Sequence, residues 1–210
     1  MKTLLHPTYF PNIATFAVIV QKDFLWEAHD NFQKQTYRNR SYVSTDQGKY
    51  MLTIPIKHVG AREGRQKYRD VEIDDSSNWR KQHWRTLETA YRTSPFFEFY
   101  EDDIKPLFFE PEHLLFDLNL KTIHTIGACL GIKIAHEKNN SFEKNPDMFK
   151  DLRNLVKAKK SQNIKIVEYS QVFEERNGFI GNLSVLDLLF NEGTNALEYL
   201  KNQSLDFLNA

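Results

Sequence analysis

The sequence predicts an α/β protein with a single domain, in which a mostly parallel, Rossmann-like sheet is flanked by helices and the middle of the chain is helical. Short extended patterns alternate with helical patterns near both ends of the chain, which is typical of layered α/β folds. Helical patterns follow one another from about residue 77 to 130. The length of 210 residues suits one domain, and no internal repeat is visible.

The N-terminal segment predicts the first alternation of strand and helix. A short strand is expected to end near His6, and a helix is expected over 13–20, where apolar residues recur at helical spacing. Residues 24–28 predict a second strand, in which Glu27 and His29 point to the same side. Two successive strands joined by a helix are the basis of the parallel-sheet prediction.

A β-hairpin and a loop are predicted next. Residues 41–45 and 50–56 have strand-like patterns and are separated by the turn dipeptide Gln47-Gly48. Residues 58–69 are rich in glycine and charge, which indicates a surface loop.

The rest of the chain predicts mainly helices. The helices of the middle segment are expected over 79–92, 96–109 and 112–130. Beyond them the pattern predicts a strand at 132–136, a flexible connection over about 137–147, a helix at 148–160, a strand at 164–169, and a helix from a cap at Asn182 or Ser184 to about Gly193.

Composition excludes several classes of protein. Lysine plus arginine and aspartate plus glutamate number 28 each, so no global field attracts nucleic acid and no nucleic-acid partner is expected. No stretch approaches the roughly 18 apolar residues of a membrane span, and the first residues lack a signal-peptide core, so a cytoplasmic location is expected. Cys129 is the only cysteine, which excludes internal disulfides.

The strongest chemical signal is KQTYRNR, residues 34–40, where Lys34, Arg38 and Arg40 surround Tyr37 and Asn39. Arginine side chains match the geometry of carboxylate and phosphate groups, so an anion site is one interpretation. A solvated strand edge or structural ion pairs are the other. In an extended segment Arg38 and Arg40 would point to one side, where both could bind the same anion.

Two further groups of residues could belong to this site. Glu27 could orient the imidazole of His29 for acid–base chemistry, although a purely structural hydrogen bond is the alternative. His6 and Tyr9 lie where the first strand should end, the usual place of ligands in open α/β sheets, although their rings could simply pack inward. His6 or His58 could supply a third metal ligand, but no motif fixes such a geometry, so no metal is predicted. The cofactor is unknown, because no cofactor-binding motif is present.

Five segments, taken in order, resemble the WbqC-like protein family, particularly its short Bacteroidetes-type members. They are HPTYFPNIATF at 6–16, EAHDNFQKQTYRNR at 27–40, LTIPIKH at 52–58, WRKQHWRTLETAYRTSPFFEFY at 79–100 and NLSVLDLLFNEG at 182–193. The resemblance implies a protein of surface-polysaccharide (O-antigen) biosynthesis that transfers a glycyl or similar acyl group to an amino sugar. Longer members usually open with Gln-Pro where this chain has His6-Pro7, and they carry a further glycine-containing strand and helix around 138–163.

The leading hypothesis is therefore a transferase or ligase-like enzyme, of the acyl or aminoacyl type, that joins an anionic activated small molecule to an amine-bearing sugar or similar acceptor. The predicted catalytic residues are His29 as base, Glu27 and His6. The predicted substrate-binding residues are Tyr9, Lys34, Tyr37, Arg38, Asn39 and Arg40. The alternative is a noncatalytic protein that binds a nucleotide, a sugar precursor or a partner protein through the same residues. The sequence does not indicate an oligomeric state.

Overall fold

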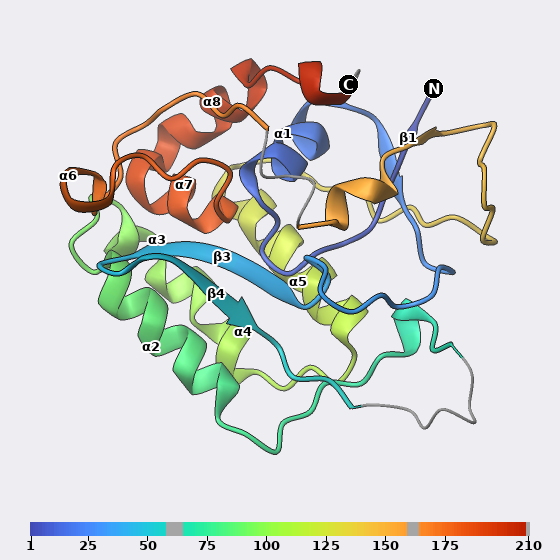
Figure 1. The fold of residues 1–210 in the computed structure, drawn as a ribbon, viewed down its shortest axis with the longest axis horizontal. Helices are drawn as coiled ribbons and strands as arrows, with labels where there is room; N and C mark the ends of the chain where they lie inside the picture. The colour runs from blue at the N-terminus through green and yellow to red at the C-terminus, as the bar shows by residue number, and fades with distance from the viewer. Residues whose placement is uncertain (58–64, 159–163, 209–210) are drawn as a thin grey trace.

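Two small β-sheets are enclosed by helices in the computed structural model of the chain, which describes residues 1–57, 65–158 and 164–208 (Figure 1). The first sheet is parallel, has the strand order β2-β1-β5, and consists of β1 (Thr3–Leu5), β2 (Phe24–Trp26) and β5 (Lys150–Asp151). The second is an antiparallel hairpin of β3 (Arg40–Thr45) and β4 (Gly48–Thr53). The α/β class is thus confirmed, but the parallel sheet of the described residues is small and a Rossmann-like fold is not confirmed.

Helix α1 (Ile13–Gln21) connects β1 to β2, as the sequence predicts. It begins at Asn12, whose Oδ1 accepts a hydrogen bond from Thr15 N at 2.8 Å and thereby caps the first turn. Residues 13–19 are all buried, because the helix packs against α7 (Val185–Glu192) and α8 (Ala196–Asn202). The β1-α1-β2 unit therefore places the loop after each strand at one edge of the sheet.

The middle of the chain is helical and covers the hairpin (Figure 1). Its helices are α2 (Trp79–Tyr91), α3 (Phe97–Ile104), α4 (Pro106–Phe109) and α5 (Leu115–Cys129). The helix predicted over 96–109 is divided at Pro106, which lacks the N–H needed to continue it. The helix predicted over 112–130 begins later, because Ile73 N donates to His113 O at 2.9 Å and holds that segment extended.

Residues 148–158 differ from the predicted helix. They form β5 and then a short 3₁₀-helix, η3 (Arg153–Val156). The side chain of Asp151 accepts a hydrogen bond from Arg153 N at 3.0 Å, which turns the chain out of the strand. Residues 159 and 160, the end of the predicted helix, lie outside the described residues.

The strands predicted at 132–136 and 164–169 are wrong, because side chains of other segments bind the backbone there. The indole of Trp26 donates to Ala135 O at 2.9 Å. The amide of Gln203 accepts from Val167 N and donates to Lys165 O, both at 3.2 Å. These bonds satisfy the backbone without a strand partner.

Two of the predicted loops are described only in part or are tied to a strand. The connection over 137–147 begins against β2, where Trp26 N donates to Glu137 O at 2.8 Å and Asn139 N donates to Trp26 O at 2.9 Å. Much of the loop predicted over 58–69 lies outside the described residues, and its end forms the 3₁₀-helix η2 (Tyr68–Asp70).

The C-terminal region is helical. The single-turn α6 (Glu174–Asn177) precedes α7, whose cap is Ser184, one of the two predicted residues. Helix α7 ends at Gly193 with a positive φ of 54°, as expected for a C-terminal glycine. The 3₁₀-helices η5 (Gly193–Asn195) and η6 (Asp206–Leu208) flank α8, which the sequence analysis did not predict.

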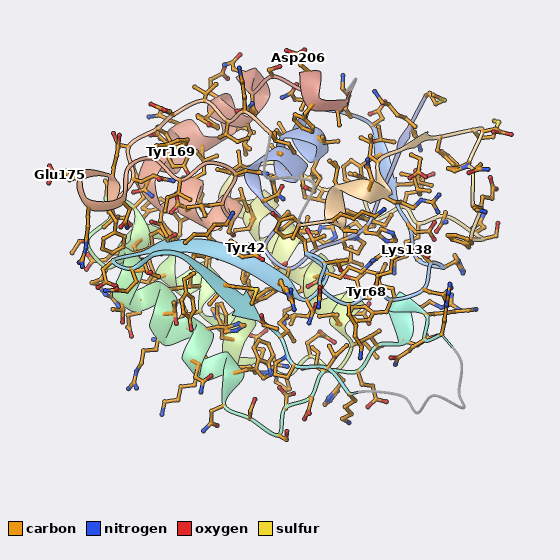
Figure 2. The ribbon with its side chains drawn as sticks, in the orientation of Figure 1. Tyr42, Tyr68, Lys138, Tyr169, Glu175 and Asp206 are labelled. Carbon is orange, nitrogen blue, oxygen red and sulfur yellow. The ribbon has the colours of Figure 1, made fainter. Side chains whose placement is uncertain are left out.

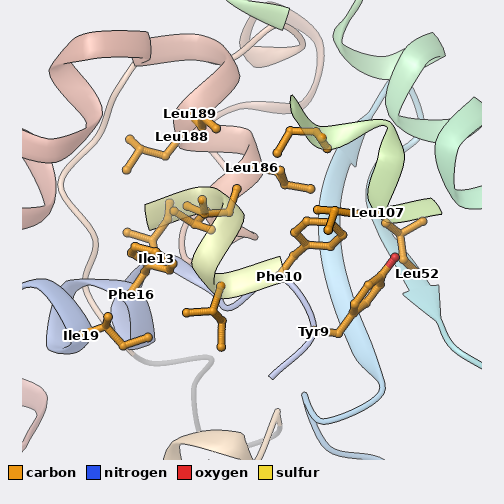
Figure 3. Packing of buried hydrophobic residues seen from close by; sticks show 14 of the residues in the cluster. Tyr9, Phe10, Ile13, Phe16, Ile19, Leu52, Leu107, Leu186, Leu188 and Leu189 are labelled. Atoms are coloured by element: carbon orange, nitrogen blue, oxygen red, sulfur yellow. The ribbon is translucent and has the colours of Figure 1, made fainter. Parts of the chain in front are cut away.

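The core joins these layers into one cluster (Figure 3). Phe10 packs against the ring of Phe108, and its neighbours in the cluster include Leu107 of α4 and Leu186 of α7. The loop after β1 therefore lies inside the molecule, where both of its aromatic residues, Tyr9 and Phe10, are buried. Within the described part of the chain, none of the helices combines the length and apolarity needed to cross a membrane.

Candidate functional site

The segment KQTYRNR is first of all a structural junction. Its last residue opens β3, Lys34 and Gln35 are exposed, and residues 36–39 are buried between the N-terminal loop, the hairpin, helix α5 and η3. Four hydrogen bonds hold its backbone: Tyr9 N to Tyr37 O at 3.1 Å, Tyr37 N to Val156 O at 2.9 Å, Ile54 N to Asn39 O at 2.9 Å, and Asn119 Nδ2 to Arg38 O at 2.6 Å. The side chains of the segment are therefore presented from a fixed backbone.

Arg38, His6 and Asp30 form a compact polar group at the ends of the first two strands. Arg38 Nη2 lies 2.6 Å from His6 Nε2 and 3.0 Å from Asp30 Oδ2, and His6 Nε2 lies 3.1 Å from the same oxygen. Arg38 is only 1% exposed and its guanidinium lies over the ring of Tyr68, labelled in Figure 2, at 5.2 Å from the centroid. Residues far apart in the sequence thus meet in one buried cluster.

The cluster contains one permanent cation and one anion at neutral pH. Burial, followed by the charge of Arg38, lowers the pKa of His6 to about 4, so the ring is neutral at pH 7. Burial would raise the pKa of Asp30, but the close contact with His6 and the charge of Arg38 outweigh it and the pKa is lowered. Burial also lowers the pKa of Arg38, which nevertheless stays protonated because a guanidinium is so strongly basic.

Several donors of this cluster have no partner among the described residues. Arg38 carries five N–H groups, and only those of Nη2 are used, whereas Nε and Nη1 are buried and unpartnered. His6 Nδ1 is also buried without a partner, whichever ring nitrogen bears the proton. Leaving a buried donor unpaired costs about 1–3 kcal/mol. A bound oxyanion that reached this wall would remove that cost.

A second arginine, Arg153, lies beside the cluster but is fully paired. Its guanidinium binds Asp151 through two bonds of 2.9 and 2.7 Å, and its Nη1 donates to Glu27 Oε2 at 3.0 Å. Glu27 is completely buried, and its Oε1 accepts from the backbone N–H groups of His29 and Asp30 at 2.7 and 3.1 Å. Glu27 thus fixes the turn that carries Asp30 and holds Arg153 in place.

These residues line a cavity of about 410 Å³. Its lining residues are His6, Asp30, Gln33, Arg38, Phe142, Lys144, Asp151, Arg153, Asn154, Val156 and Lys157. Four of them are basic and two are acidic, so the lining favours a negatively charged ligand. We call it the Arg38 cavity.

The other predicted residues are placed elsewhere. Lys34, Asn39 and Arg40 line a separate cavity of about 290 Å³, so Arg38 and Arg40 do not face the same space as the alternation suggested. Arg38 precedes β3 and its side chain turns inward, whereas Arg40 begins the strand. Tyr37 is buried against the ring of Tyr42, at a centroid distance of 5.8 Å.

Tyr9 and His29 lie outside both linings. The hydroxyl of Tyr9 is buried 3.1 Å from Nδ1 of His83, in the core under α2. The ring of His29 lies 3.4 Å from Arg69 Nη1, and the hydrogen bond between His29 and Glu27 is donated by the backbone N–H of His29, not by its imidazole. The expected geometry, in which Glu27 orients the ring of His29, differs from the structure.

Asp30, Asp151 and Arg153 line the Arg38 cavity but were not among the site residues predicted from the sequence. Asp30 could have been found from its place directly after the EAH segment, but Arg153 gives no local signal, because its partner Glu27 is 126 positions away. His58, the other suggested metal ligand, lies outside the described residues. Among the residues that are described, no group of three or more histidine, cysteine or acidic side chains could hold a metal ion.

Comparison with known proteins identifies the family. The model of the WbqC-like protein family matches residues 6–164, which include the whole Arg38 cavity. The "Uncharacterized protein Rv1507c" of Mycobacterium tuberculosis is 28% identical over 230 residues, covering 94% of this chain and 96% of that protein. No solved structure matches the chain. Because the family model spans well over half of the sequence, the chain belongs to the WbqC-like protein family.

Proposed function

We propose that the chain binds the anionic part of an activated small molecule in the Arg38 cavity and transfers an acyl or related group from it to an amine-bearing sugar or similar acceptor. Surface-polysaccharide biosynthesis is the setting that the family resemblance suggests, and the cytoplasm is the location expected from the sequence patterns. One observation carries the proposal: Arg38, an almost fully buried cation, keeps the N–H groups of Nε and Nη1 unpartnered among the described residues.

The chemistry of the cluster suits recognition of phosphate or carboxylate. Nε and Nη1 lie on different sides of the guanidinium, and each offers a separate charge-assisted N–H donor to an oxygen of such a group. Asp30 Oδ2 accepts a hydrogen bond from Arg38 Nη2 at 3.0 Å, which holds the plane of the guanidinium in one orientation. Lys144 and Lys157 add positive charge to the lining. A diphosphate or acyl phosphate fits this charge better than a neutral sugar does.

In the transfer reaction, the acceptor amine would attack the activated carbonyl carbon, a C–N bond would form, and the phosphate or carboxylate leaving group would depart with its charge neutralised by Arg38. The amine must lose a proton in this step. We assign this role to His29, which lies outside the lining of the Arg38 cavity but is partly exposed and adjoins the lining residue Asp30 in the chain.

A noncatalytic binding protein is the second candidate, and two observations favour it. His6 is a weak base, since its pKa is lowered to about 4 by burial and by Arg38. The carboxylate of Glu27 binds the backbone of His29 and not its ring. In this case the protein would retain a nucleotide or a sugar precursor without converting it.

Calorimetric titration with inorganic pyrophosphate, uridine diphosphate and a nucleotide sugar tests the site. We expect Arg38→Lys to weaken the best ligand by about tenfold to a hundredfold, because two charge-assisted bonds are lost while the charge remains. Arg85→Met, which removes an exposed arginine of α2 outside the Arg38 cavity, is the matched control. Circular dichroism verifies that each variant is folded.

Two results decide between the candidates. If the folded Arg38→Lys variant bound the ligand with the same affinity as the parent, the proposal that Arg38 forms an anion site would be wrong. For catalysis, we expect His29→Gln to abolish product formation in a single-turnover assay with the best ligand and an amino sugar, while ligand affinity is retained. Unchanged cellular function of His29→Gln, together with loss of function in Arg38→Lys, would favour the noncatalytic protein.

A further inference from the structure

The cavity that contains Arg40 has the features of a ligand site of its own. Its lining residues are Phe32, Lys34, Gln35, Asn39, Arg40, Thr53, Ile54, Pro55 and Ile56, and its volume is about 290 Å³. Two of these residues are cations and none is acidic. Three of its polar side chains carry a buried atom without a partner among the described residues: Asn39 Oδ1, Arg40 Nε and Thr53 Oγ1. We call it the Arg40 cavity.

Asn39 requires a hydrogen-bond donor from a ligand. The Nδ2 of its side chain donates to Ile54 O at 3.0 Å, and because a carbonyl only accepts, this bond fixes which end of the amide is which. Oδ1, the acceptor end, is therefore the end without a partner. Asn39 is only 9% exposed, so this acceptor lies in the inner wall.

Arg40 requires the opposite, an oxygen acceptor. Its Nε–H is a buried donor, its charge is reinforced in the lining by Lys34, and none of the described lining residues is a carboxylate that would offset it. Thr53 Oγ1, which can donate or accept, is the third unpartnered atom. The remaining wall is apolar, formed by Phe32, Ile54 and neighbouring residues.

We infer that the Arg40 cavity binds a small carboxylate that bears a hydroxyl group on the adjacent carbon. The carboxylate accepts from Arg40 Nε–H, the hydroxyl donates to Asn39 Oδ1, and Thr53 bonds to either group. A plain carboxylate leaves Asn39 unpaired. A zwitterionic amino acid supplies a donor, but its ammonium is repelled by the two lining cations.

This site is independent of the proposed function, because the two cavities have no described lining residue in common. Gln33 and Arg38 face the Arg38 cavity, whereas Lys34, Gln35, Asn39 and Arg40 face the Arg40 cavity. Gln35 has a φ of 61°, a conformation unusual for a residue other than glycine, and it lies at this turn of the wall. The sequence cluster that suggested one anion site is thus divided between two.

Nuclear magnetic resonance on the ¹⁵N-labelled full chain tests the inference with L-lactate as the probe and acetate, L-alanine and inorganic phosphate as comparisons. We expect L-lactate to shift the signals of the Asn39 side-chain amide and of Arg40 Nε–H, with an affinity at least about fivefold higher than that of acetate or alanine. Sodium chloride at matched ionic strength controls for charge screening.

Variants assign the shifts to the site. Arg40→Met should weaken L-lactate at least tenfold, and Thr53→Val, which has nearly the same shape, should reduce the preference for lactate over acetate. Arg38→Lys should leave lactate binding unchanged even if it abolishes binding in the Arg38 cavity, so the two proposals can fail separately. Absence of a lactate shift at Arg40 Nε–H, equal shifts with chloride, or equal affinity for lactate, acetate and phosphate would overturn the inference.

Discussion

At the scale of single residues, the decisive feature is how each buried charge is paired. Glu27 is a fully buried carboxylate whose two oxygens are both used, by backbone N–H groups on one side and by Arg153 on the other. Arg38, by contrast, finds partners within the described part of the chain for only one of its side-chain nitrogens, Nη2. A side chain with complete pairing stabilises the fold, whereas one with unused buried donors is suited to a ligand.

Replacement of Glu27 tests the structural role of this acid. We expect Glu27→Gln to lower the free energy of unfolding by about 3 kcal/mol, because Arg153 loses a buried charged partner. In addition, the new amide N–H group must face either the guanidinium or the backbone N–H groups, and two donors cannot bond to each other. Asp151→Asn, which alters the half-exposed partner of the same arginine, should cost less than about 1 kcal/mol. Urea unfolding measures both.

His29→Gln is the companion measurement for the predicted acid–base pair. The ring of His29 is not held by Glu27, so this variant should change stability by no more than about 0.5 kcal/mol. A loss as large as that of Glu27→Gln would show that the two side chains act as a pair after all.

At the scale of elements, local signals determined what the sequence could predict. Helix α7 has its cap at Ser184 and its terminal glycine at Gly193, and both are visible in the sequence. The segment at 164–169 has a strand-like pattern too, but its backbone is bound by the side chain of the distant Gln203, for which no local rule exists. Arg153 was not predicted for the same reason, because its partner Glu27 is distant in the sequence. His6 and Arg38 could be proposed as site residues because both lie in short, chemically unusual segments.

Helix α5 contains a glycine that local rules would replace. In a helix interior, Gly→Ala ordinarily stabilises by up to about 1 kcal/mol. A Cβ at Gly127 would lie 2.5 Å from Ile134 Cγ1 and 3.2 Å from Ile132 O, in the segment that leaves the helix. We therefore expect Gly127→Ala to destabilise the protein by about 1–3 kcal/mol, measured by urea unfolding.

A double-mutant cycle with Ile134→Ala provides the control. Removing the contacting side chain should relieve the clash, so the double variant should be more stable than the sum of the two single changes predicts, by about 1 kcal/mol or more. Additive effects, or a stabilising Gly127→Ala, would show that the segment after α5 moves aside freely.

At the scale of the whole molecule, the N-terminal loop, the helices of the middle segment and helix α7 are joined by buried polar bonds as well as by the apolar core. Asn119 of α5 donates to Arg38 O at 2.6 Å and to Tyr68 Oη at 2.5 Å, and Tyr68 donates to Pro7 O at 2.7 Å. Asp187 of α7 accepts from Tyr91 of α2 at 2.6 Å. Titration of buried groups should therefore affect the stability of the whole fold.

Two buried histidines predict a loss of stability in weak acid. Burial, as the largest cause, lowers the pKa of His6 and that of His83 from 6.5 to about 4. Between these values the unfolded chain binds more protons than the folded one, so the free energy of unfolding should fall as the pH falls from 6.5 to 4, by at most about 3 kcal/mol for each histidine.

Urea unfolding at several pH values between 4 and 7, on the parent, His6→Gln and His83→Gln, measures this loss. Each variant should remove its own part of the slope, because glutamine does not titrate. Asp187 has the opposite effect on the pH dependence, because burial raises its pKa and its contribution to the free energy of unfolding is lost as the pH rises. This contribution is the same in all three proteins and therefore cancels when their slopes are compared. Equal slopes in the parent and both variants would mean that both histidines titrate alike in the folded and the unfolded chain, so that His6 would add a positive charge to the lining of the Arg38 cavity below about pH 6.5.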